Sequence, residues 1–227
     1  MTGLVVILIA IIVTPIFVVN AFRVLSSDWF VRHELGQDDF PADRYGLEGD
    51  DRLALALIGL RSIQPGTDGI ALLERATLPD GSPAFDDREL RHMADVRGLL
   101  GQAVRLQLIV VSVLVALGIA LRRSSRWRTV VPRGLQVGTF VTFGIAVLAV
   151  PIILLGFDGF FVQFHSVFFD GDSWRFSTTD TLLRLYPEAF WQDTSQLASG
   201  IAVAQAVVVA AASTWWLRRL RLERSLP

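Results

Sequence analysis

Residues 134–157 read GLQVGTFVTFGIAVLAVPIILLGF, a run without a single Asp, Glu, Arg or Lys. Three further stretches also lack these charged residues: 1–22, 106–121 and 194–217. A helix needs about 20 apolar residues to cross the hydrocarbon core of a bilayer. Four such runs in a chain of 227 residues that is 52% hydrophobic predict a polytopic membrane protein.

The composition excludes several classes of protein. The chain has no Cys, so it has no thiol nucleophile, thiolate metal site or disulfide framework. All 21 basic residues are Arg, which excludes general-base or Schiff-base chemistry on Lys. The net charge of −1 gives no general attraction to nucleic acid, which we therefore do not expect as a partner.

The positions of the arginines predict the orientation in the membrane. Basic residues concentrate in cytoplasmic loops beside the spans. The connection after the second run carries Arg122, Arg123, Arg126, Arg128 and Arg133 with no acidic residue, and the segment after the fourth run carries four more arginines. The other two connections are rich in Asp and Glu. Both termini are therefore expected in the cytoplasm.

We predict an all-α membrane protein, a four-transmembrane-helix bundle with a small α+β extracytoplasmic cap. The predicted segments are transmembrane helices 1–22, 104–121, 134–157 and 197–217, a cap domain 23–103, a basic cytoplasmic loop 122–133, an interfacial aromatic segment 158–196 and a cytoplasmic tail 218–227.

The cap contains two local signals. Residues 71–85 predict a hairpin or paired extended segments around the turn Pro79–Asp80–Gly81. Asp86 followed three residues later by Glu89 is a variant of the capping box that begins helices. The helix that begins there is expected to continue into the second span.

His92 and Asp95 lie three residues apart on that helix and are neighbours on its surface. A carboxylate beside an imidazole can hold it in one tautomer, although a surface pair without a role fits the same spacing. Arg105 lies near the expected outer interface, where it either faces a polar cavity or extends to the headgroups. We keep Arg105 as a candidate site residue.

The second outer segment is rich in aromatic residues. If GFFVQFHSVFF (159–169) is helical, Phe161, His165 and Phe168 share one face. Aromatic residues concentrate at the membrane–water boundary, where Trp174 and Trp191 also fit as anchors. The segment therefore places one imidazole near the depth of a lipid ester, unless the histidine is incidental to an aromatic patch.

Two of the three histidines, His92 and His165, lie in the two outer segments, while His33 is expected on the surface. A pair of imidazoles at the lipid interface suits general acid–base chemistry on an ester. Two other arrangements remain open: a metal site of His92, Asp95 and His165, and a Ser166 nucleophile without the usual G-x-S-x-G context. No motif supports a metal or a cofactor, and we assign none.

Two blocks of sequence carry a resemblance to a known family. FDDRELRHMADVRGLL (85–100) and FVQFHSVFFDGDSWRFSTTDTLLRLYPEAFW (161–191) resemble the signature blocks of the bacterial lipoprotein intramolecular transacylases, in the same order. The four-span layout is similar as well. The resemblance places the protein in the bacterial cytoplasmic membrane, with its active site on the extracytoplasmic face.

The resemblance implies an acyltransferase. Such enzymes move the sn-2 acyl chain of a diacylglyceryl-modified lipoprotein to the α-amino group of the same N-terminal cysteine. The expected partners are therefore diacylglyceryl-modified lipoproteins and membrane lipids. The resemblance also implies His92 and His165 as the catalytic pair. We add Asp95 as a residue that orients a histidine, and Arg91 and Trp174 as residues that shape the pocket and bind polar head atoms. The alternatives are another membrane acyl hydrolase or acyltransferase, or a non-catalytic anchor or sensor. The oligomeric state is not predicted.

Overall fold

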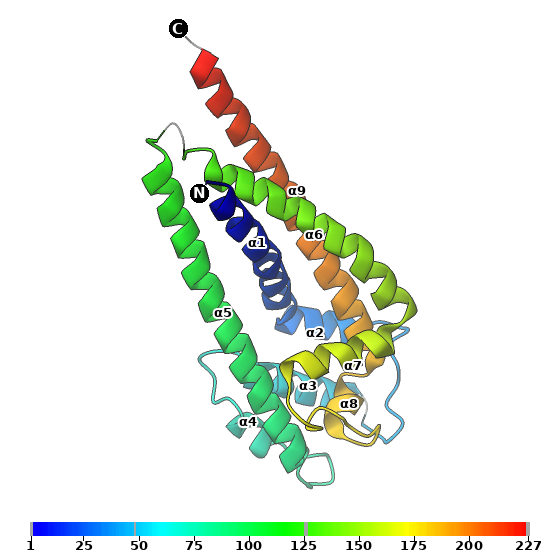
Figure 1. Ribbon diagram of the computed structural model, residues 1–227. Coiled ribbons are helices and arrows are strands. Elements are labelled where there is room, and N and C mark those ends of the chain that lie inside the picture. The colour runs from blue at the N-terminus through cyan, green and yellow to red at the C-terminus, as the bar shows by residue number, and fades with distance from the viewer. Residues whose placement is uncertain (1, 48, 125–126, 226–227) are drawn as a thin grey trace. The chain divides into compact units, whose positions relative to one another are not determined.

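A computed structural model describes residues 2–47, 49–124 and 127–225 (Figure 1). These residues form two compact units. The membrane unit consists of the described residues up to Phe22, of Val104–Ile152 and of those from Gln196 onward. The cap unit consists of Arg23–Ala103 and Ile153–Ser195. The helices of the described chain are α1 Thr2–Leu25, α2 Asp28–Leu35, α3 Gly49–Ile63, α4 Ala71–Glu74, α5 Asp87–Leu121, α6 Val130–Leu155, α7 Phe157–Phe168, α8 Thr181–Leu185 and α9 Glu188–Ser225.

Four helices, α1, α5, α6 and α9, are long and apolar enough to cross a membrane. Large apolar side chains stay exposed along them, as is suitable for a surface that faces lipid rather than water. They include Leu8, Ile11, Ile109, Val113, Phe140, Leu148 and Val208. The prediction of a multi-pass helical membrane protein is confirmed.

Helices α1 and α6 approach each other closely because two glycines face α1. A Cβ atom built on Gly134 would lie 2.6 Å from Cβ of Ile9, and one on Gly138 would lie 2.7 Å from Cβ of Val13. Glycines four residues apart allow helix backbones to approach in membranes. One turn further, the Thr142 hydroxyl is hydrogen-bonded to that of Thr14 at 2.9 Å.

A cluster of three side-chain amides joins α1, α5 and α9 in the membrane unit. Asn20 donates to Oε1 of Gln205 at 2.9 Å, and Gln107 donates to Oδ1 of Asn20 at 2.7 Å. Gln205 also donates to the carbonyl oxygen of Phe17. Interhelical hydrogen bonds of this kind stabilise helix association where water is absent.

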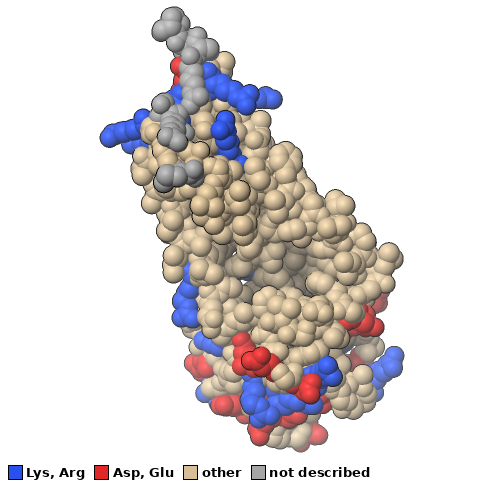
Figure 2. Space-filling view, viewed as in Figure 1, with Lys and Arg blue, Asp and Glu red and all other residues tan. Residues whose placement is uncertain are grey.

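Arginines gather at one end of the membrane unit, near the ends of α5 and α9 (Figure 2). The exposed ones are Arg122, Arg123, Arg133, Arg218, Arg219 and Arg221. Arg128 forms an ion pair with Glu223 at 3.3 Å. Arg126, part of the predicted basic loop, lies outside the described residues, as do Met1 and residues 226–227.

The prediction of an α+β cap is wrong. The described residues of the cap unit are helical or irregular, and the hairpin is reduced to one isolated antiparallel bridge between Thr77 and Pro83. The turn itself forms, with Gly81 at a φ of 84°. Residues 71–74 form the short helix α4 instead, which buries Leu73. A two-stranded hairpin is marginal by itself, and the described part of the chain has no third strand to support this one.

Helix α3 contacts α2, α4 and α8 within the cap unit. The hydroxyl of Tyr186 donates a short hydrogen bond to the Ala56 carbonyl oxygen across the face of Gly59. Arg52 on the same helix donates to the carbonyl oxygens of Pro41 and Arg184. These bonds connect α3 to the segment that leads into α9.

Candidate active site

The site begins at the N-terminus of α5. The backbone N–H of Glu89 donates to Oδ1 of Asp86, and the N–H of Asp86 donates to Oε2 of Glu89, each at 2.8 Å. This reciprocal pair is the predicted capping box, which is confirmed. His92 follows one turn later on an uninterrupted helix.

The same turn of α5 holds the segment that precedes α8. The other oxygen of Glu89, Oε1, accepts a hydrogen bond from the N–H of Leu182 at 2.7 Å. Arg88 forms an ion pair with Asp180 at 2.5 Å and stacks over Phe176 at 5.4 Å. Asp180 stands at the N-cap position of α8 but makes no capping bond there, so Glu89 from another helix supplies that acceptor.

Helix α7 fixes the tautomer of His165. Nδ1 of His165 lies 2.8 Å from the backbone carbonyl oxygen of Phe161, one turn earlier. A carbonyl oxygen only accepts, so Nδ1 carries the proton. In the neutral ring, Nε2 therefore has a free lone pair and is the atom available to take a proton.

The structure brings His92 and His165 together. Their ring centroids lie 6.0 Å apart, with 27° between the ring planes. Phe169 contacts both rings, at 4.9 Å from His92 and 5.5 Å from His165, and Phe176 lies edge-on to His92 at 5.3 Å. Two imidazoles from separate segments thus share one aromatic environment.

Burial keeps this pair uncharged. The side chain of His92 is 8% exposed, and its Nδ1 has no hydrogen-bond partner within the described chain. A buried imidazole without an acidic partner is more stable neutral. Burial also lowers the pKa of His165 below its ordinary value of 6.5, although the bond to Phe161 opposes this shift. Neutral imidazoles are the form that general-base chemistry requires.

Trp174 completes the aromatic enclosure. Its ring lies 5.1 Å from that of His165 and is only 6% exposed, so its expected place as an interfacial anchor is wrong. The indole Nε1 is buried and has no acceptor among the described residues.

The other candidate residues are less closely connected to the pair. Asp95 and Arg91 are exposed on α5, and no hydrogen bond joins Asp95 to His92 in the described chain. Arg105, in the membrane unit, is also exposed. Gln107, two residues further along α5, is buried instead. The roles of Asp95, Arg91 and Arg105 stay predictions. His33 is exposed as expected and stacks on Trp29.

The two other arrangements left open by the sequence have no geometric support. Within residues 2–47, 49–124 and 127–225, no three His, Asp or Glu side chains are placed to hold a metal ion. The Ser166 hydroxyl is exposed and donates to the Gln163 carbonyl oxygen at 2.8 Å, rather than to an imidazole.

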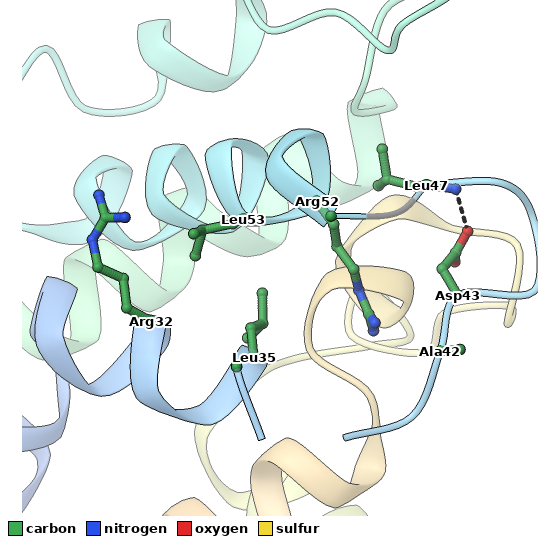
Figure 3. Close-up of a pocket in the computed structure, with 9 residues that line it drawn as sticks. Arg32, Leu35, Ala42, Asp43, Leu47, Arg52 and Leu53 are labelled. Atoms are coloured by element: carbon green, nitrogen blue, oxygen red, sulfur yellow. Dashed lines mark hydrogen bonds between the residues drawn. The ribbon is translucent and has the colours of Figure 1, made fainter. Parts of the chain in front are cut away.

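A pocket of about 450 Å³ in the cap unit is lined by neither His92 nor His165 (Figure 3). Arg32 of α2 and Arg52 of α3 border it, with Leu35 and Leu53 between them. The guanidinium of Arg52 is occupied by backbone carbonyl oxygens, and Asp43 is paired with Arg184 at 3.0 Å. Arg52 and Asp43 therefore serve packing within the cap unit.

Sequence reasoning missed the residues that position the site. Arg88 was not assigned a role, and Glu89 was expected only to cap its own helix. Phe169 and Phe176 stand inside the aromatic signature block, but no spacing rule connects them to His92. Their contacts form between segments that are distant in sequence, so helical periodicity gives no signal for them.

Fold and site together define a polytopic helical membrane protein whose cap unit brings together two imidazoles, the buried His92 and the half-buried His165. The sequence profile described as "Lipoprotein intramolecular transacylase Lit" matches residues 71–191, which include both histidines. The chain belongs to this family of lipoprotein intramolecular transacylases, which are acyltransferases.

The chain is similar to a relative in sequence and to solved structures in fold. An uncharacterized protein of Aquifex aeolicus (strain VF5) is 33% identical over 174 residues, which cover 75% of each chain. The lipoprotein intramolecular transacylase Lit of Bacillus cereus has the same fold, with a TM-score of 0.73 at 18% identity and coverage of 98% of both chains. A single-histidine-to-alanine variant of that protein matches with a TM-score of 0.72 at 19% identity, over 98% of this chain and 96% of the other.

Proposed function

We propose that this protein transfers the sn-2 acyl chain of a lipoprotein's diacylglyceryl-cysteine to the α-amino group of the same cysteine. The product is an N-acylated lyso-form lipoprotein. The observation that carries the proposal is the contact between the buried His92 and the half-buried His165, inside the segment that matches the transacylase family. The substrate supplies the nucleophile, so the chain itself needs neither Cys nor Lys.

The proposed roles follow from the protonation of the two rings. Nε2 of His165 accepts the proton that the attacking amine releases, because Nδ1 is committed to the Phe161 carbonyl oxygen. His92 assists the departure of the glycerol oxygen. The amine nitrogen forms the new amide bond, the ester C–O bond breaks, and one proton passes from nitrogen to the alkoxide, so no co-reactant is required.

Tethering provides much of the acceleration. The amine and the ester belong to one molecule, and holding two such groups in a reactive geometry replaces an encounter in solution. The aromatic residues around the pair exclude water, which would otherwise hydrolyse the ester. Phe169 and Phe176 supply that environment at His92.

The proposed setting is the outer leaflet of the bacterial cytoplasmic membrane, with diacylglyceryl-modified lipoproteins and membrane lipids as partners. Both termini lie in the cytoplasm in this proposal, and the predicted segment boundaries describe its topology. The exposed arginines at one end of the membrane unit support it. The natural absence of Cys allows a direct test, in which Ser82→Cys reacts with an impermeant maleimide on intact cells and Arg219→Cys reacts only after lysis.

Mass spectrometry of a lipoprotein's N-terminal peptide tests the activity. The host makes diacylglyceryl-lipoprotein but lacks its own N-acylating enzyme, and it expresses wild type, His92→Ala or His165→Ala. Wild type is expected to place an acyl group on the α-amine at unchanged total mass, and both variants to leave the substrate unchanged. An increase in mass indicates acyl transfer from another lipid, and a decrease indicates hydrolysis. Either result contradicts the proposal.

A further inference from the structure

Buried polar atoms without partners concentrate around the two histidines. Five buried side-chain nitrogen or oxygen atoms in the described chain have no hydrogen-bond partner. Three of them are Arg88 Nε, His92 Nδ1 and Trp174 Nε1. Phe176 contacts both Arg88 and His92 and so lies between them. A buried donor without an acceptor costs about 1–3 kcal/mol, so the concentration of such atoms at one site calls for a ligand that supplies the missing bonds.

Trp174 is the most specific of the three. An indole N–H only donates, so Nε1 requires a hydrogen-bond acceptor, and a carbonyl oxygen is suitable. The ring lies 5.1 Å from His165, whose Nε2 is free. The side chain is more than nine-tenths buried, so water does not compete for the bond.

The backbone around Trp174 is held from several sides. Arg175 stacks over the indole ring at 5.2 Å and forms an ion pair with Asp172 at 3.2 Å. The carbonyl oxygen of Arg175 accepts from Arg88, which is also paired with Asp180. The bond from Arg88 holds the loop that carries Trp174 against α5, and a donor that is positioned in advance is effective towards developing charge.

We propose that Trp174 is a catalytic residue whose Nε1–H donates to the ester carbonyl oxygen as that oxygen becomes an oxyanion. This inference rests on the proposed acyl transfer. When the amine attacks the carbonyl carbon, the π pair moves to the oxygen, and the bond from the indole strengthens because its acceptor becomes charged. Collapse of the intermediate returns the pair to the new amide carbonyl. Trp174 transfers no proton.

A neutral donor suits this environment better than a charged one. His92 lies among Phe169 and Phe176 with no carboxylate bonded to it, so an imidazolium there is disfavoured. The indole stabilises negative charge without first acquiring a proton. An ester carbonyl that reaches Nε1 displaces the side chains that now cover it.

The test replaces the N–H alone. Trp174 is exchanged for β-(3-benzothienyl)alanine, which keeps the bicyclic shape and has sulfur in place of N–H. The same exchange at Trp29 is the matched control, because Trp29 is 68% exposed and has no role in the proposed reaction. Acyl transfer by the purified proteins is measured on a diacylglyceryl lipopeptide. We expect kcat to fall about 10²–10³-fold at position 174 with little change in KM, and no change at position 29.

Other outcomes separate the two proposals. If wild type transfers the acyl chain and the Trp174 analogue keeps kcat within about threefold of wild type, the role of the N–H is contradicted and the proposed function stands. A loss confined to KM also contradicts it, because the bond would then form equally in the bound substrate. A wild-type protein that produces no N-acylated lipopeptide overturns the proposed function and this inference together. Matching thermal unfolding midpoints show that the analogue is folded.

Discussion

His165 donates a hydrogen bond from Nδ1 to the backbone carbonyl oxygen of Phe161, at 2.8 Å. The bond is local, between residues one turn apart on α7, and therefore forms as soon as that helix forms. It selects the Nδ1–H tautomer and leaves Nε2 as the basic atom beside His92. A short helix thus selects the tautomer of the residue that is proposed to act as the base.

The tautomer and its titration are open to NMR. In protein with ¹⁵N-labelled histidine, neutral His165 is expected to show a protonated Nδ1 and to titrate below 6.5, because burial lowers its pKa. The unfolded chain takes up this proton at the ordinary pKa, so it binds more protons than the folded protein in this window. Stability is therefore expected to decrease as pH falls below 6.5. An Nε2–H tautomer, or titration above 6.5, contradicts the assignment.

The two histidines are expected to behave as a unit. His92→Ala and His165→Ala should each lower kcat for acyl transfer about 10²–10⁴-fold. The double variant should be little worse than either single variant, because each ring requires the other. His33→Ala is the control, since His33 is exposed on α2. Fully multiplicative losses in the double variant would show that the rings act independently.

Glu89 is expected to stabilise two segments at once. Glu89→Ala removes the acceptor for the N–H groups of Asp86 and Leu182, at about 1.5–3 kcal/mol for each bond to a charged group. The thermal unfolding midpoint in detergent should fall clearly, and Glu89→Gln should have a smaller effect because it retains one oxygen. Glu188→Ala removes an exposed bond to Gln192 and should have little effect. Equal midpoints for the Glu89 and Glu188 variants would contradict this role.

Gly138 is expected to be essential for the packing of α6 against α1. The methyl group of Gly138→Ala would lie 2.7 Å from Cβ of Val13, and overpacking of this kind costs about 1–3 kcal/mol. Gly144→Ala is the matched control on the same helix, because nothing lies within 4 Å of its added methyl group. Unfolding in detergent micelles compares the two. A Gly138 variant as stable as the Gly144 variant would show that the two helices are not held at this separation.

The periodicity of the sequence predicts the features that depend on neighbouring residues. The four apolar runs become spans, and Asp86 with Glu89 forms the expected capping box, because each depends on residues within a turn or on composition. The hairpin around Gly81 fails as a strand pair, since a strand needs a partner that no local signal supplies. The contacts of Phe169 and Phe176 with His92 form between segments whose approach is set by tertiary packing. The placement of His92 and His165 in the two outer segments predicts that they can share a site, and the resemblance to a family adds the catalytic role.

The most direct test of the account is a crossover experiment with the purified protein. One lipopeptide carries both a deuterated sn-2 acyl chain and a heavy-isotope peptide, the other carries neither label, and the two are mixed in equal amounts. Tandem mass spectrometry then locates the acyl group on the products. With wild type we expect deuterated acyl chains on the α-amine of heavy peptides only, and light acyl chains on the α-amine of light peptides only. With His165→Ala we expect no acyl group on the α-amine. Mixed products would show transfer between molecules and contradict the intramolecular reaction.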